Sequence, residues 1–188
     1  MRPSTKTLGA LGIAGAPFLF LEMNAYDNAN TRLTGVYDLL YMIGWMCSIA
    51  ALLRLRAAGS KKWGIAVFYI QLFFLALANI SNVWVIIHPN SGSGLYRVLD
   101  LFWPISNVWM LACGITIIVN AGLQGWRRYV VLLAGIWLPI TMLTGMTAGK
   151  SLVTFYISGL YSVITWAFMG WAVFTMDRRE EPQLALAV

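Results

Sequence analysis

Six long apolar stretches run along this 188-residue chain, and short polar segments separate them. A helix that crosses a bilayer needs about 20 mostly apolar residues, because each residue advances it by roughly 1.5 Å and the hydrocarbon core is roughly 30 Å thick. Six such helices use nearly the whole chain. The sequence therefore predicts an all-α, polytopic integral membrane protein in which residues 1–188 form a single six-helix transmembrane domain.

The composition agrees with a membrane-embedded chain and excludes a water-soluble module. Hydrophobic residues make up 60% of the sequence and charged residues 11%, with a mean hydropathy of +0.72. We expect no nucleic-acid partner, because the net charge of +6 follows membrane topology, and we expect membrane lipids as partners. The predicted spans are residues 8–26, 36–53, 64–87, 97–119, 127–148 and 152–175.

Basic residues gather on one side of the membrane when these spans are laid out alternately. The richer side holds Arg2, Lys6, Arg54, Arg56, Lys61, Lys62, Arg127, Arg128, Arg178 and Arg179. The other side holds only Arg32, Arg97 and Lys150. Because cytoplasmic segments are enriched in Lys and Arg, we predict that the N- and C-termini are both cytoplasmic. The compact loops favour a bacterial inner membrane.

Residue types that hold metals or cofactors are scarce. Cys47 and Cys113 are isolated thiols, and His88 is the only histidine. One histidine is too few for a bis-histidine haem site, and no Cys and His spacing fits zinc. We expect no metal and no cofactor, and no motif names a reaction.

Acidic residues near the spans all fall on the predicted outer side. Glu22 lies about one helical turn inside the first span, where a charge should face the bundle interior or a water-filled cavity because exposure to lipid is costly. An interfacial Glu that reaches out to water is the alternative. Glu22, Asp38 and Asp100 are candidate catalytic acids or bases, although they stand on three different spans.

Uncharged polar residues share single faces of the later spans and lie mainly in the predicted outer half. At about 100° per residue, Asn79 and Asn82 share one face of the third span, and Asp100 and Asn107 share one face of the fourth. This pattern predicts an outward-facing polar cavity edged by Trp; the alternative is hydrogen bonding between helices, about 1 kcal/mol for each pair. The candidate ligand-binding residues are Glu22, Asn79, Asn82, Trp84, Asp100, Trp103, Asn107, Thr144, Ser158, Tyr161 and Ser162.

The first span carries small residues four apart. Ala10 and Ala14 form one such pair, and Gly12 and Ala16 form another. Small residues let two membrane helices approach closely, so this face predicts a contact either inside the bundle or with another subunit of a homo- or hetero-oligomer.

The sequence favours a membrane protein that binds a small molecule or lipid from the outer side, as a receptor or as the substrate-capturing component of a transporter. In size, helix count and predicted orientation the chain is similar to the substrate-binding subunits of vitamin uptake transporters, and the Ala10 and Ala14 spacing resembles the small-residue contact of such subunits. Two alternatives stay open. One is an intramembrane enzyme that acts on a lipid or isoprenoid-like substrate through buried carboxylates, and the other is a structural or assembly subunit.

Overall fold

The predicted six-span, all-helical architecture is confirmed. The computed structural model describes residues 3–26, 31–89, 93–149 and 151–176, and within these ranges the regular elements are all helices. The helices long and apolar enough to cross a membrane are Thr5–Asn24, Arg32–Arg54, Lys62–Ile87, Gly94–Val119, Arg127–Ala148 and Leu152–Phe174. These bounds lie within a few residues of the predicted ones.

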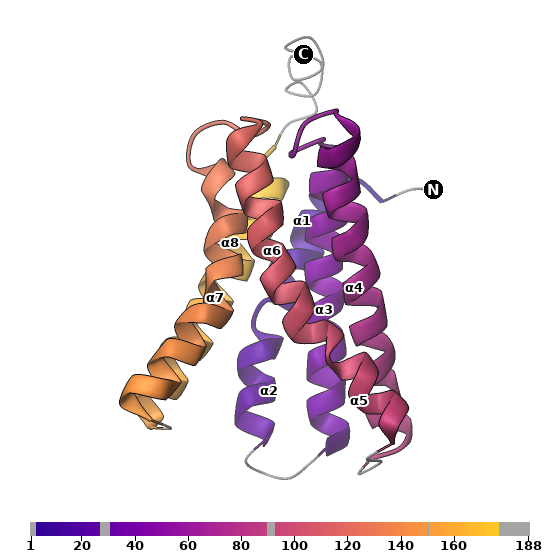
Figure 1. The fold of residues 1–188 in the computed structure, drawn as a ribbon, viewed down its shortest axis with the longest axis vertical. Helices are drawn as coiled ribbons and strands as arrows, with labels where there is room; N and C mark the ends of the chain where they lie inside the picture. The colour runs from indigo at the N-terminus through magenta and orange to yellow at the C-terminus, as the bar shows by residue number, and fades with distance from the viewer. Residues whose placement is uncertain (1–2, 27–30, 90–92, 150, 177–188) are drawn as a thin grey trace.

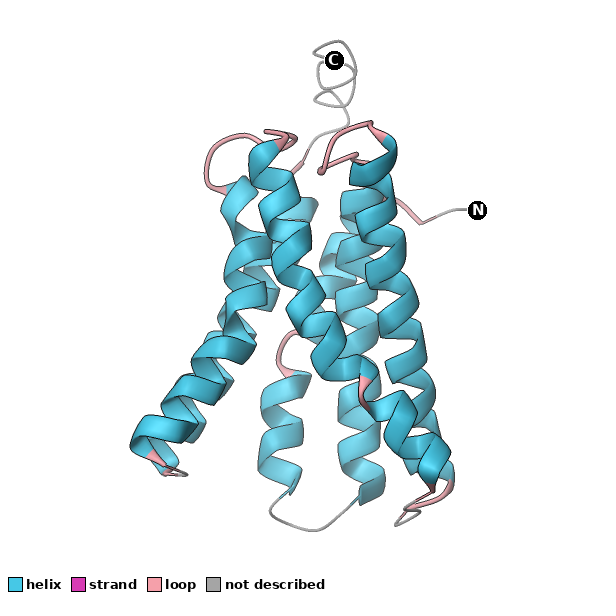
Figure 2. Ribbon diagram, viewed as in Figure 1, coloured by secondary structure: helices cyan, strands magenta, loops and turns pink. Residues whose placement is uncertain are grey.

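Two of the spans are broken, which was not predicted (Figure 1, Figure 2). The first consists of α1 (Thr5–Gly15) and α2 (Phe18–Tyr26), and the fourth of α5 (Gly94–Asp100) and α6 (Phe102–Val119). The others are the continuous helices α3 (Thr31–Arg54), α4 (Lys62–Ile87), α7 (Arg127–Ala148) and α8 (Leu152–Phe174).

Proline accounts for both breaks, because it has no N–H to donate to the carbonyl four residues earlier. At Pro17 the helix stops, and the Ile13 carbonyl instead accepts from the Ala16 N–H at 3.3 Å. At Pro104 the carbonyl of Asp100 loses its donor, and α6 restarts at Phe102, which puts this proline in a first turn where it is tolerated. Pro139 lies within α7, which continues through it.

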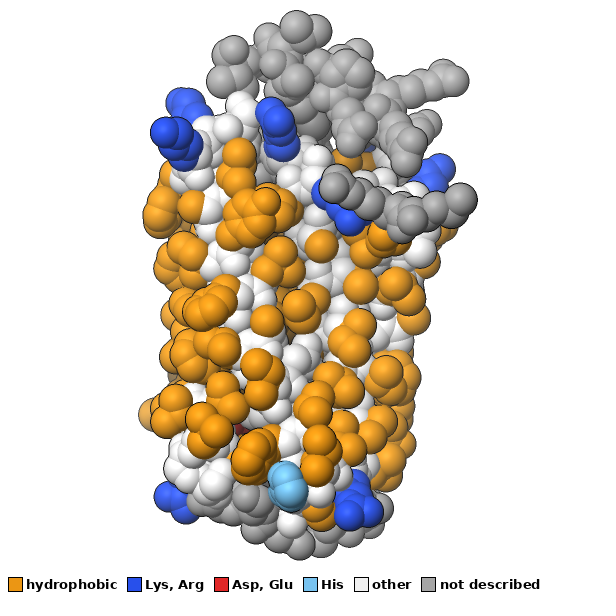
Figure 3. Space-filling view, turned by 90° about the vertical axis from the view of Figure 1, so that its right-hand side faces the viewer, with side chains coloured by type: hydrophobic (Ala, Val, Ile, Leu, Met, Phe, Trp, Pro, Cys, Tyr) orange, Lys and Arg blue, Asp and Glu red, His pale blue; other side chains and the backbone are white. Residues whose placement is uncertain are grey.

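The bundle has two chemically different ends. α1 begins and α8 ends at the end that also holds the loops 55–61 and 120–126, and we call this the basic end (Figure 1). Its basic side chains among the described residues are Lys6, Arg54, Arg56, Lys61, Lys62, Arg127 and Arg128. Arg32 and Arg97 lie toward the opposite end, and an apolar belt separates the two ends on the face shown in Figure 3. The assignment of the basic end to the cytoplasm stays a prediction.

Glycines bring α1 into direct backbone contact with α3 and α8. A Cβ on Gly15 would lie 2.8 Å from the Cα of Gly44, and a Cβ on Gly9 would lie 2.8 Å from the Gly170 carbonyl oxygen. Gly12 and Ala16 are also buried, so this part of the predicted small-residue face packs inside the bundle. Ala10 and Ala14 are exposed instead, and a contact through them with another subunit stays a prediction.

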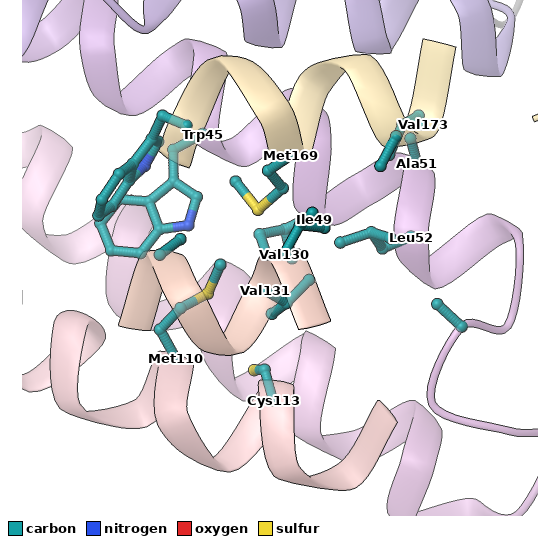
Figure 4. Packing of buried hydrophobic residues seen from close by; sticks show 14 of the residues in the cluster. Trp45, Ile49, Ala51, Leu52, Met110, Cys113, Val130, Val131, Met169 and Val173 are labelled. Atoms are coloured by element: carbon teal, nitrogen blue, oxygen red, sulfur yellow. The ribbon is translucent and has the colours of Figure 1, made fainter. Parts of the chain in front are cut away.

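The densest packing lies between the middle of the bundle and the basic end. Figure 4 shows Trp45 of α3, Met110 of α6, Val131 of α7 and Met169 of α8 converging there, and each of them is almost fully buried. The opposite half is different. α5 has no buried residue, and every buried residue of α7 comes before Pro139.

Candidate functional site

Three carboxylates gather in the half of the bundle opposite the basic end. Glu22 stands on α2, Asp38 on α3, and Asp100 ends α5. Both Glu22 and Asp100 lie within electrostatic range of Asp38, so the fold brings together candidates from three spans. None of the three takes part in an ion pair within the described residues. They are also not grouped tightly enough there to hold a metal ion.

Tyr41 connects these acids to the middle of the bundle. It lies one helical turn beyond Asp38 on α3, within electrostatic range of that carboxylate, and its side chain is 1% exposed. Its ring centroid is 5.8 Å from that of Trp45 and 5.6 Å from that of Trp166. A polar phenol is therefore held between the carboxylates and buried indoles.

The indoles form a continuous layer across four helices. Trp45 of α3 meets Trp166 of α8 edge-on, with centroids 5.2 Å apart. Trp166 meets Trp137 of α7 at 5.9 Å, and Trp137 meets Trp103 of α6 at 5.9 Å. Such edge-to-face contacts each add about 0.5–1.5 kcal/mol beyond the area that they bury. We call Tyr41, Trp45, Trp103, Trp137 and Trp166 the aromatic layer.

Several polar atoms at this layer are buried without a hydrogen-bond partner. They are the hydroxyl of Tyr41, the indole nitrogens of Trp45 and Trp166, and the side-chain oxygen of Asn107 on α6. A buried polar atom left without a partner costs about 1–3 kcal/mol, and native structures leave few such atoms. The Trp137 indole, by contrast, donates to the Ser158 carbonyl at 2.8 Å. The layer thus presents three donors and one acceptor that the described protein atoms do not use.

The predicted amides do not meet as one group. The side-chain nitrogen of Asn79 donates to the sulfur of Met46 at 3.2 Å, and that of Asn82 donates to the sulfur of Met42 at 3.2 Å. Both amides therefore serve the contact between α4 and α3. The side-chain nitrogen of Asn107 donates within its own helix, to the Trp103 carbonyl at 3.0 Å.

Most of the predicted hydroxyls are engaged by backbone carbonyls. Thr144 donates to Ile140 at 2.9 Å, and Ser162 donates to Gly159 at 2.7 Å. Tyr161 donates to the Leu133 carbonyl at 2.8 Å, on the side of the bundle formed by α7 and α8.

Two candidates remain. Ser158 is buried, and its carbonyl accepts from Trp137. Trp84 lies against His88 at the end of α4, with ring centroids 5.1 Å apart.

The structure brings together five sequence-predicted residues at the carboxylates and the aromatic layer. They are Glu22, Asp38, Asp100, Trp103 and Asn107.

Sequence reasoning left Tyr41, Trp45, Trp137 and Trp166 out of the candidate site. Their depth was the available signal, because indoles far from both membrane interfaces need partners inside the bundle. The pairing of rings from α3, α6, α7 and α8 depends on how the helices pack, which periodicity does not give.

Carboxylates above a layer of aromatic rings form a chemical setting suited to a cation. Acidic groups attract positive charge, and the faces of Trp and Tyr hold ammonium groups through their ring quadrupoles. Aromatic cages for quaternary ammonium groups are built in this way. Comparisons of this chain with protein-family models, with curated proteins and with solved structures find no match.

Proposed function

We propose that this protein binds a small organic cation from the outer side of the membrane, as a receptor or as the substrate-capturing component of a transporter. The observation that carries the proposal is the convergence of Glu22, Asp38 and Asp100, without an ion pair among the described residues, beside the aromatic layer. In this proposal the carboxylates supply the charge and the rings supply the contact surface.

Electrostatics favours a positively charged ligand. Carboxylates that share a region of low dielectric repel one another, and burying an unpaired charge is costly. A bound cation removes both penalties. The unpaired donors of Trp45 and Trp166 fit a ligand that carries a hydrogen-bond acceptor next to its cationic centre.

The loosely packed opposite half offers a route to the site. Beyond Pro139 the side chains of α7 are half-buried or exposed, and Met146 is 81% exposed. Irregular backbone at membrane depth is tolerated where it lines a cavity or is covered by protein, and the breaks at Pro17 and Pro104 flank the carboxylates. These features support a site in the part of the bundle that can open with little loss of packing.

Thermal unfolding with a cationic probe tests the proposal. The purified protein is heated with tetraethylammonium or benzyltrimethylammonium chloride, and sodium chloride of equal ionic strength serves as the reference. A probe at 100 times its dissociation constant should stabilise the fold by about 2.7 kcal/mol. The triple variant Glu22→Gln, Asp38→Asn and Asp100→Asn should lose this response.

A matched control removes three acids elsewhere. The variant Asp177→Asn, Glu180→Gln and Glu181→Gln changes the sequence after the last span and should keep the response. Equal loss in both triple variants, or no response to either probe in the native protein, would contradict cation binding.

The same carboxylates also support a second candidate, an intramembrane enzyme that acts on a lipid or isoprenoid-like substrate. Glu22 or Asp38 would then act as an acid or base, so Glu22→Gln would abolish turnover of such a substrate while probe binding survives. If all the acid substitutions only destabilise the bundle in detergent, the structural-subunit interpretation is favoured.

We further propose that the protein resides in a bacterial inner membrane with the basic end in the cytoplasm. Single cysteines at Ser93 and Ser60, in a background that lacks Cys47 and Cys113, test this orientation. An impermeant thiol reagent should label position 93 in intact cells and leave position 60 unlabelled. The reverse pattern would invert the membrane orientation and with it the direction of the site.

A further inference from the structure

A second feature of the molecule lies away from the carboxylates, on the surface where α7 and α8 pack together. A groove with a volume of about 500 Å³ runs between the two helices. Its walls include Trp126, Tyr129 and Leu133 on one side and Tyr161, Ile164 and Phe168 on the other. This volume falls within the range of roughly 300–1,000 Å³ that small-molecule sites occupy.

The groove lies in the membrane half next to the basic end. α7 begins at Arg127, so Trp126 and Tyr129 stand at the level of that end, while Leu133 is about 10 Å further in at roughly 1.5 Å for each residue. Trp126 closes one side by an edge-on contact with Phe168, with centroids 6.1 Å apart. The groove thus extends from the interface toward the bilayer middle.

The interior of the groove is suited to hydrocarbon. Two of its three hydroxyl-bearing residues are already engaged, since Tyr161 donates to the Leu133 carbonyl at 2.8 Å and Thr165 donates to the Tyr161 carbonyl at 2.9 Å. The third, Tyr129, stands near the basic end. The remaining walls are aromatic and aliphatic side chains, which are about half exposed except for the buried Val130. Away from the basic end, the described walls of the groove therefore offer little to a polar ligand.

The mouth of the groove is positively charged. The guanidinium carbon of Arg128 lies 4.8 Å from the ring centroid of Tyr129, one of the groove walls. The Nε of Arg128 is buried and has no hydrogen-bond partner among the described residues. Arginine binds phosphate oxygens through several N–H groups in one plane, so this side chain is poised to pair with an anionic headgroup.

We propose that this groove binds an anionic glycerophospholipid from the leaflet at the basic end, with an acyl chain between α7 and α8 and the phosphate on Arg128. Charge complementarity selects this occupant, because an apolar groove beside the Arg128 guanidinium fits an amphiphile with a negative head. The site is separate from the carboxylates and does not depend on the proposed cation.

Native mass spectrometry with mixed lipids tests this site. The protein is incubated with equimolar phosphatidylglycerol and phosphatidylcholine, and retained lipid is counted. The native chain should retain phosphatidylglycerol in preference. Arg128→Gln should lower this preference about fivefold, the effect expected of one basic side chain near anionic lipid. Arg97→Gln, which removes the same charge near the opposite end, should leave it unchanged.

A groove-filling variant separates the acyl-chain site from general attraction to anionic lipid. Ile164→Trp should lower retention of phosphatidylglycerol although the charge is intact. Equal retention of both lipids by the native chain, or an Arg128→Gln preference that matches the native value, would overturn the proposal. A dimer that Ile164→Trp dissociates would also overturn it, because the groove would then be filled by a second copy of the chain.

Discussion

The two halves of this bundle use opposite packing strategies. Toward the basic end, glycines let α1 pack backbone to backbone against α3 and α8, and Gly114 and Gly135 do the same between α6 and α7. Toward the opposite end, α2 and α5 are short segments set off by proline, and α7 has no fully buried residue after Pro139. The three carboxylates lie in this second half.

The contrast separates stability from function. In lipid, close van der Waals packing is the main force that joins helices, so the glycine contacts contribute strongly to the cohesion of this half. A half that packs loosely and carries acids contributes little to cohesion. In the proposed function this half retains the freedom to admit a ligand, as expected of the less stable parts of proteins.

The largest effect is expected where the backbones touch. Gly44→Leu should prevent or severely weaken folding, because a Cβ at this position would lie 2.8 Å from the Cα of Gly15 and neither backbone can retreat. Gly145→Leu is the matched control, since a Cβ there meets no atom within 4 Å. Thermal unfolding in detergent measures both. Similar melting temperatures for the two variants would refute the proposed role of the glycine contacts.

The aromatic layer should come next. Trp166→Ala is expected to cost about 3–5 kcal/mol, because this indole is 2% exposed and touches the rings of Tyr41, Trp45 and Trp137. Trp171→Ala should cost far less, since Trp171 is 48% exposed and stacks only on Phe174 among the described rings. Comparable losses in unfolding free energy would show that the layer is not a special part of the core.

The two amides predicted from sequence should behave differently. Asn82→Leu should cost about 0.6 kcal/mol, a typical interhelical hydrogen bond in a membrane, and should keep the response to tetraethylammonium. Asn107→Leu removes the unpaired oxygen at the aromatic layer, and should weaken that response while stability changes little. If Asn82→Leu weakened the response and Asn107→Leu did not, the ligand site would lie nearer α4.

The smallest effect is expected at a hydroxyl engaged by its own helix. Thr144→Val should change the free energy of unfolding by less than about 0.5 kcal/mol and leave probe binding intact, because the hydroxyl donates to the Ile140 and Thr141 carbonyls of its own helix. A large loss of probe binding would return Thr144 to the site.

Sequence patterns predicted the helices well, whereas the ligand-binding role of the site residues stays a prediction. Apolar length and the alternation of basic loops give the spans, since both follow directly from the thickness and chemistry of the bilayer. Asn79 and Asn82 share one face of α4, and their amides donate to the sulfurs of Met46 and Met42 of α3. Periodicity shows which face of a helix is polar, but it does not show which residues that face contacts. The carboxylates converge through tertiary packing between spans, and the spacing of residues along the sequence does not show which spans are neighbours.

Cysteine accessibility along α3 tests the central claim most directly. In a background without Cys47 and Cys113, Asp38→Cys and Ser48→Cys place thiols on one helix about 15 Å apart, one at the carboxylates and one in the packed half, where Ser48 is 0% exposed. A cationic, impermeant methanethiosulfonate reagent should label position 38 in intact cells and should leave position 48 unmodified. No labelling at either position, or equal labelling at both, would contradict a ligand-accessible region around the carboxylates beside a closely packed core.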